Sequence, residues 1–158
     1  MRRDGGSAAI LVIVLLPLLL AVVTSVVQLG TVRVLASRVA TAADLATLAA
    51  ADDQDQSELV RSGALQLAPD AVAVAREFFA LNLAQIAAHL DTTPEAVAAA
   101  ADIVAFPTVP AVDPLTGWRY DRPTIRISAA VPVRTPAFGM LLLPRTTVLS
   151  VRAASSAR

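Results

Sequence analysis

The stretch AAILVIVLLPLLLAVVTSVVQL, residues 8–29, decides how this chain is organised, because it contains no charged residue. As an α-helix it is about 33 Å long, which is enough to cross a hydrocarbon core of roughly 30 Å. Pro17 bends such a helix and frees one backbone carbonyl, a defect that membrane helices tolerate. The segment therefore predicts a single transmembrane helix, preceded by a short leader at residues 1–7.

A cleaved signal peptide is the main alternative for this segment. Signal peptides have an apolar region of about 7–15 residues, followed by a cleavage site of small residues. Here the apolar run is longer, and the nearest late site, residues 35–37, lies beyond Arg33. These features favour a retained anchor. Arginines flank the run on both sides, so the positive-inside rule leaves the orientation nearly tied.

Helical character continues beyond the apolar run, through residues 30–51, because nothing there breaks a helix. Apolar residues recur at spacings of three and four, as they do along the buried seam of an amphipathic helix. We expect this stripe to pack on the second helix of the same chain or on another subunit. Its members are Val32, Leu35, Val39, Ala42, Ala46 and Ala49.

The remaining sequence predicts a polar linker at residues 52–67 and a small α+β domain at residues 68–158. Pro69 and Asp70 suit the start of a second helix, and Thr93 suits the cap of a short third one. The stripe of the second helix consists of Val72, Phe79, Leu83, Ile86 and Leu90. Three strands are expected at residues 103–109, 124–133 and 146–153, with polar residues such as Arg126 on the outer face. The expected fold is α+β and pilin-like, with a three-stranded antiparallel sheet packed on the second helix.

Composition excludes several classes of function. The chain has no cysteine, a single histidine and a net charge of zero. We therefore expect no disulfide, no metal site, no cofactor and no binding of nucleic acid. His89 has no serine and aspartate placed to complete a catalytic triad, so no catalytic residue is assigned and the chain is not expected to be an enzyme.

Two further clusters are candidate sites. The acidic residues Asp52, Asp53, Asp55 and Glu58 lack the glycine and the ligand spacing of a calcium loop, which favours a solvated linker. Trp118, Arg119 and Tyr120 are of the types that anchor interfaces, so they form a candidate contact patch. The alternative for this patch is a loop whose aromatic rings fold back onto the sheet.

The N-terminal third resembles the TadE/TadG-like pilus-assembly family. The resemblance rests on the basic, glycine and small residues of RRDGGSAA (2–9), on LLPLL (15–19) and on RVATAADLATLAAA (38–51). The closing strand TTVLSVRA (146–153) is similar too. This resemblance implies that the chain is a structural or assembly subunit of a Tad (Flp) type IV pilus or a related secretion system, such as a minor pilin or pseudopilin.

The resemblance also implies a location and partners. The N-terminus would lie in the cytoplasm and the C-terminal domain outside the inner membrane or in an extracellular filament. The partners would be the lipid bilayer, other pilin-like subunits, platform proteins and a prepilin peptidase cutting between Gly6 and Ser7. Processed pilins carry Glu at the fifth mature position, where this chain has Leu11, so we expect the leader to be retained. The alternative function is a membrane-anchored extracytoplasmic binding or sensor module.

Overall fold

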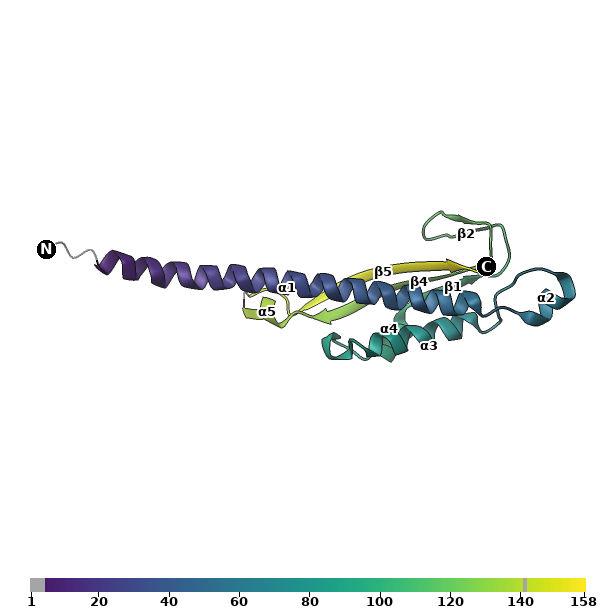
Figure 1. Cartoon of the computed structure of the whole chain (residues 1–158), viewed down its shortest axis with the longest axis horizontal. Helices are drawn as coiled ribbons and strands as arrows, with labels where there is room; N and C mark the ends of the chain where they lie inside the picture. Colours follow the sequence, from purple (N-terminus) through teal and green to yellow (C-terminus); the bar gives the residue numbers. More distant parts are fainter. Residues whose placement is uncertain (1–4, 141) are drawn as a thin grey trace.

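A single long helix runs the length of the molecule and carries a small domain on its C-terminal half (Figure 1). The computed structural model describes the backbone of residues 5–140 and 142–158, and the side chains of these residues apart from 5–11, 56 and 140. Helix α1 spans Gly5–Asp52, 48 residues, and continues through Pro17 without a break. The predicted long helix is therefore confirmed.

Four shorter helices follow α1, and they correct several predicted boundaries. They are α2 (Gln56–Ser62), α3 (Ala71–Ala84), α4 (Pro94–Ala100) and α5 (Pro136–Met140), with a 3-10 turn, η1, at Ala87–His89. Helix α3 begins after Asp70, so Pro69 is not its first residue. It also ends before Ile86, and that residue is buried from the following turn instead. The predicted cap of α4 is confirmed, because the Thr93 hydroxyl accepts the Ala96 N–H at 3.2 Å.

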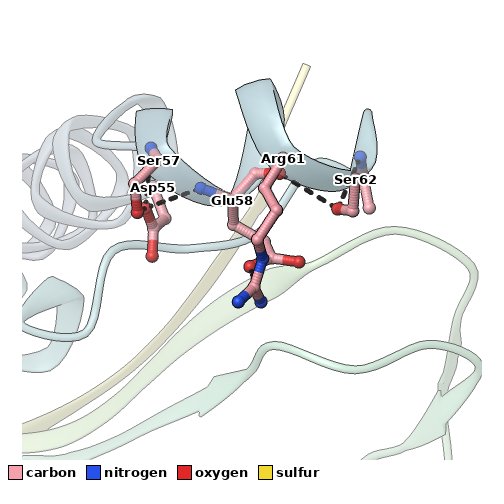
Figure 2. Close-up of polar contacts among 6 residues, drawn as sticks. Asp55, Ser57, Glu58, Arg61 and Ser62 are labelled. Carbon is pink, nitrogen blue, oxygen red and sulfur yellow. Dashed lines mark hydrogen bonds and ion pairs between the residues drawn. The ribbon is translucent and has the colours of Figure 1, made fainter.

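Helix α2 lies where the sequence predicted only a polar connection. Asp55 caps it: one carboxylate oxygen accepts the N–H groups of Ser57 at 3.0 Å and Glu58 at 3.1 Å (Figure 2). Glu58 forms an ion pair with Arg61 one turn later. Gly63 ends the helix with φ 72°, a left-handed conformation that glycine adopts without a steric penalty. The acidic residues are thus partly used to build a local helix.

The predicted three-stranded antiparallel sheet is confirmed, with the order β1–β4–β5. Strand β1 spans Asp102–Phe106, β4 Thr124–Arg134 and β5 Thr146–Ser156. Ile127 of β4 pairs with Ile103 of β1 on one side and with Ala153 of β5 on the other. Strand β1 ends before Pro107, which has no N–H for the ladder. The intervening loop contains a short hairpin, β2 (Ala111–Val112) with β3 (Arg119–Tyr120), that was not predicted.

The sheet packs mainly on α1 and less extensively on α3, so the predicted packing on the second helix accounts for only part of the contact. Helix α1 contacts α3 on one side and β4 and β5 on another, while α3 touches the sheet less extensively. Figure 1 shows α1 running alongside both β5 and α3. The largest buried side chains of this core include Phe79, Leu83, Ile125, Ile127, Val39 and Val131. The C-terminal half of α1 is therefore the centre of the fold.

Candidate assembly surfaces and a candidate ligand groove

The predicted packing stripe of α1 faces the chain's own domain. Leu35, Val39, Ala42 and Ala46 are buried, whereas Val32 and Ala49 at its two ends are half-buried. This side of α1 packs against α3, β4 and β5. Alanine and valine leave little side-chain volume between the backbones, so the helices and the sheet can approach closely. The stripe is thus used within the molecule.

A second stripe of α1 is exposed and carries three apolar residues in the domain-bearing half, with the polar residues Arg38 and Thr41 on the same face between Val34 and Leu45. Val34, Leu45 and Leu48 are 55%, 46% and 49% exposed. Leu45 and Leu48 follow Val34 by 11 and 14 residues. Both separations are close to whole numbers of helical turns, so the three residues share one face. Val27 and Val23 continue the same face toward the N-terminus and are exposed as well. This outer stripe lies about a third of a turn from the buried one.

The N-terminal half of α1 has no protein cover over most of its surface. Leucine, isoleucine and valine side chains from Val12 to Leu20 are exposed on every face, and none of the intervening residues is charged. Among the described residues, α1 alone is long and apolar enough to cross a membrane. An apolar surface of this extent fits a single-pass membrane anchor and is not expected in water.

A buried acidic residue holds the loop between β2 and β3. Asp113 has no exposed surface; one of its carboxylate oxygens accepts the Leu115 N–H at 2.9 Å, and the other accepts the Thr116 hydroxyl at 2.8 Å. The same oxygen lies 3.2 Å from Nε of Arg126 in β4. Burial by itself raises the pKa of Asp113, but these hydrogen bonds and the Arg126 charge outweigh it and lower the pKa below its ordinary value of 3.8.

The local sequence Asp-Pro-Leu-Thr-Gly explains this loop. The Asp113 side chain closes an Asx turn on the backbone two residues later, and Gly117 reverses the chain with φ 73°. The Gly117 N–H donates to the Asp113 carbonyl at 2.8 Å. The buried carboxylate therefore ties the turn to the sheet through Arg126. It also contributes to a raised pKa of Tyr120, after the larger effect of that residue's own burial.

Arg126 corrects the prediction that it faces solvent. Its side chain is 2% exposed, and the buried Asp113 of the β2–β3 loop lies against it. Nη2 donates to Asp102 of β1 at 3.0 Å, so the cation lies between two carboxylates. Nη1 is buried without a hydrogen-bond partner among the described residues, and Nε, although 3.2 Å from Asp113, makes no well-aligned hydrogen bond there either. The alternation of apolar and polar residues in 124–133 did not predict the ion pair between Arg126 and Asp113. The Asp-Pro-Leu-Thr-Gly motif is the sequence signal that could have indicated a buried aspartate.

An open groove of about 630 Å³ lies between the β2–β3 loop and the outer face of the sheet. Its lining includes the exposed Arg122, Arg152 and Trp118, the last 71% exposed, together with Asp121 and the buried, ion-paired Arg126. Arginine and an exposed indole suit a ligand or segment with negative charge and a flat apolar surface. The groove is a candidate ligand site.

The structure divides the predicted patch of Trp118, Arg119 and Tyr120. Trp118 and Arg119 point outward, with Arg119 3.4 Å from the exposed carboxylate of Asp121. Tyr120 is half-buried, and its ring lies 5.1 Å from that of Phe106. One aromatic residue is thus available for contact and the other folds back, so each of the two alternatives describes part of the patch.

The remaining candidates lie apart from this groove. His89 is exposed in η1. No group of three or more potential metal ligands occurs within the described side chains. Gly6 and Ser7 belong to the first turns of α1, but their side chains and that of Leu11, like residues 1–4 of the leader, lie outside the described parts.

A protein-family model described as "Putative Flp pilus-assembly TadE/G-like" matches residues 6–53. The match coincides almost completely with α1, which spans Gly5–Asp52. It confirms the resemblance inferred from this segment and supports a role in Flp pilus assembly, which implies contacts with other pilus components. No curated protein and no solved structure matches the chain significantly.

Proposed function

We propose that the chain is a pilin-like structural subunit, a minor pilin or pseudopilin, of a Flp-type IV pilus or a related secretion machine. The observation that carries the proposal is the unpartnered outer stripe of α1. Its apolar members are Val27, Val34, Leu45 and Leu48, and the exposed polar residues Arg38 and Thr41 lie on the same face between Val34 and Leu45. The family match over the same helix supports it independently.

The outer stripe suits a contact between helices of neighbouring subunits. A helix face that is apolar but lies away from its own domain is buried when a second apolar helix packs along it. The stripe crosses the boundary between the lipid-facing and domain-bearing halves of α1, so the same face could pack in the membrane and in a filament. Lipid alone would not explain why Leu45 and Leu48 are apolar, because they lie beyond Arg33 and Arg38.

We further propose that the domain lies outside the cytoplasm and that the role is structural, without catalysis. The resemblance of the N-terminal third to pilus-assembly proteins, whose domains lie outside the cytoplasm, supports this orientation. We expect the leader to be retained, because Leu11 replaces the glutamate of processed pilins. Mass spectrometry of the membrane-extracted protein tests this: an N-terminus at Ser7 would instead show processing by a prepilin peptidase.

Photo-crosslinking tests the proposed subunit contact. A photoreactive amino acid at Leu45 or Leu48 should crosslink to a second copy or to another pilus subunit in cells that assemble the appendage. Val60 is the matched control, because it is apolar and 88% exposed but lies on α2, away from the outer stripe. If Leu45 and Leu48 crosslink no more than Val60 does, the outer stripe is not an assembly surface and the proposal fails.

A membrane-anchored binding module is the second candidate function, and the groove beside Trp118 favours it. In that case Trp118→Ala would remove ligand binding, and the photoreactive group at Leu45 would find no partner subunit. For a pilus subunit whose groove has no role in assembly, Trp118→Ala should leave pilus output near the wild-type level. The two functions therefore predict opposite sensitivities for the outer stripe and the groove.

A further inference from the structure

The turn between β4 and β5 carries an apolar tip that the domain does not cover. Residues 136–144, PAFGMLLLP, contain no charged side chain. Leu142 is 97% exposed and Leu143 is 51% exposed. Such a tip is not needed to close the hairpin, and in water it would expose apolar surface without compensation.

The base of this tip is fixed by hydrogen bonds. The Thr135 N–H donates to the Arg145 carbonyl at 2.6 Å, and the Thr135 hydroxyl donates to the Pro144 carbonyl at 3.2 Å. Within the tip, the Leu143 N–H donates to the Phe138 carbonyl at 3.0 Å. The tip is therefore held by hydrogen bonds at its base and between Phe138 and Leu143, with Leu142 and Leu143 exposed.

The tip lies beside the apolar part of α1. Helix α5, which forms its first half, packs on α1 at the end of the domain nearer the N-terminus (Figure 1). At this level Gln28 is only 6% exposed, and Thr24 and Ser25 on the same side are half-buried. Gln28 precedes Arg33, the first charged residue after the apolar run, by about 7.5 Å along the helix. The covered part of α1 thus belongs to the run that is expected in the membrane.

We propose that this tip is a second membrane contact, in which Leu142 and Leu143 enter the lipid interface beside α1. The inference rests on the proposed membrane anchoring of α1. Lipid is the favoured occupant because α5 packs on α1 where the domain ends toward the N-terminus (Figure 1), and the apolar neighbours of Gln28 in the chain, Val26 and Leu29, are themselves exposed. If lipid surrounds this part of α1, Leu142 and Leu143 are expected to contact lipid as well.

The charges around the tip agree with an interfacial position. Arg145 follows the tip directly, Arg33 lies just beyond it on α1, and both are exposed. Arginine at the edge of an apolar segment suits the headgroup region, where it pairs with lipid phosphates. Two contacts, the helix and the tip, would fix the rotation of the domain about the axis of α1, which a single helical anchor leaves free.

Depth-dependent fluorescence quenching tests this contact. The chain has no cysteine, so each single-cysteine variant can carry one dye without removing other residues. Leu142→Cys, labelled with an environment-sensitive dye, would be studied in the full chain in phosphatidylcholine–phosphatidylglycerol vesicles with nitroxide-labelled lipid. Val22→Cys reports whether α1 is in the membrane. Leu115→Cys, 50% exposed in the β2–β3 loop at the far end of the domain, is the aqueous control.

We expect a blue-shifted emission and the loss of most fluorescence for dyes at positions 142 and 22, and neither change at position 115. Quenching at 22 with a response at 142 like that at 115 would overturn the tip contact while leaving the anchor intact. No quenching at 22 would overturn both the anchoring and the tip contact. A dye at 142 that is shielded only when copies associate, without quenching by lipid, would assign the tip to a subunit contact and contradict the proposal. Leu143→Cys repeats the measurement at the neighbouring position.

Discussion

The two halves of α1 are continuous in backbone and both rich in apolar residues, yet they are buried in different ways. From Val12 to Leu20 the exposed side chains point in every direction. From Leu35 to Ala51 one face is fully buried beneath the domain, and leucines on another face remain exposed. The first half is built from Leu, Ile and Val, whereas the buried face of the second half is built largely from alanine.

This difference shows how one helix can serve two environments. Bulky aliphatic side chains on all faces match a lipid solvent that surrounds the helix. Alanines on one face let α3 and the sheet lie close to the helix backbone, and the larger core side chains, such as Phe79, come from the domain. Substitutions that act on only one half can separate the two roles.

The largest effect is expected where the domain packs on the second half. Phe79→Ala removes a fully buried ring and should lower the free energy of unfolding of the domain by about 3–5 kcal/mol. Phe78→Ala, at the adjacent position with 42% exposure, should cost less than about 1 kcal/mol. Denaturant unfolding of the detergent-solubilised protein measures both. Equal costs would mean that α3 does not pack through Phe79, and neither variant should leave the membrane fraction.

A charge in the first half tests the other environment. Leu16→Arg places a cation in the expected membrane span, at a cost to insertion of about 2.5–3.5 kcal/mol. Leu48→Arg, at a site of similar exposure in the second half, should insert normally. Carbonate extraction of membranes measures the difference. If Leu16→Arg stays fully membrane-bound like Leu48→Arg, the first half is covered by something other than lipid.

Overfilling the buried stripe should have an intermediate effect. Ala46 is completely buried, so Ala46→Gln should destabilise the domain by about 1–3 kcal/mol and reduce pilus or secretion output while membrane levels persist. Arg33→Gln, at an exposed position of the same helix, is the control and should change stability by less than about 0.5 kcal/mol. Wild-type stability of both variants would indicate that this half of α1 is only a solvated stalk.

The smallest effect concerns acid stability. The folded-state pKa of Asp113 is lowered, so its ionised form stabilises the domain above the ordinary pKa of 3.8, and this contribution is lost as the pH falls through the folded value. The slope due to this one carboxylate is at most about 1.4 kcal/mol per pH unit. Unfolding measured across the acid range should show a shallower slope for Asp113→Asn than for Asp121→Asn, whose carboxylate is exposed. Identical slopes would mean that Asp113 has no stabilising charge.

Sequence by itself determined the parts of the protein that depend on local pattern. The uncharged run, the helical spacing beyond it and the alternation in residues 124–133 and 146–153 predicted α1 and the sheet, because side-chain period follows directly from backbone geometry. The cap at Thr93 is likewise local, since it depends on a single hydrogen-bonding group. The predicted strand at residues 103–109 was too long, because Pro107 has no N–H and β1 ends at Phe106. The resemblance of the N-terminal third to the TadE/TadG-like family was also evident from the sequence alone.

Only the tertiary structure decided which surfaces meet. The sheet packs on α1 and not chiefly on α3, Arg126 is buried between two carboxylates, and α5 in the β4–β5 turn packs on α1. Each of these contacts joins residues far apart in the chain. Periodicity states which side of an element is apolar, but it does not state what covers that side, because coverage depends on how the loops return the chain across it. Alternation along β4 predicted that Arg126 is exposed. It is buried because Asp113 of the β2–β3 loop packs against it.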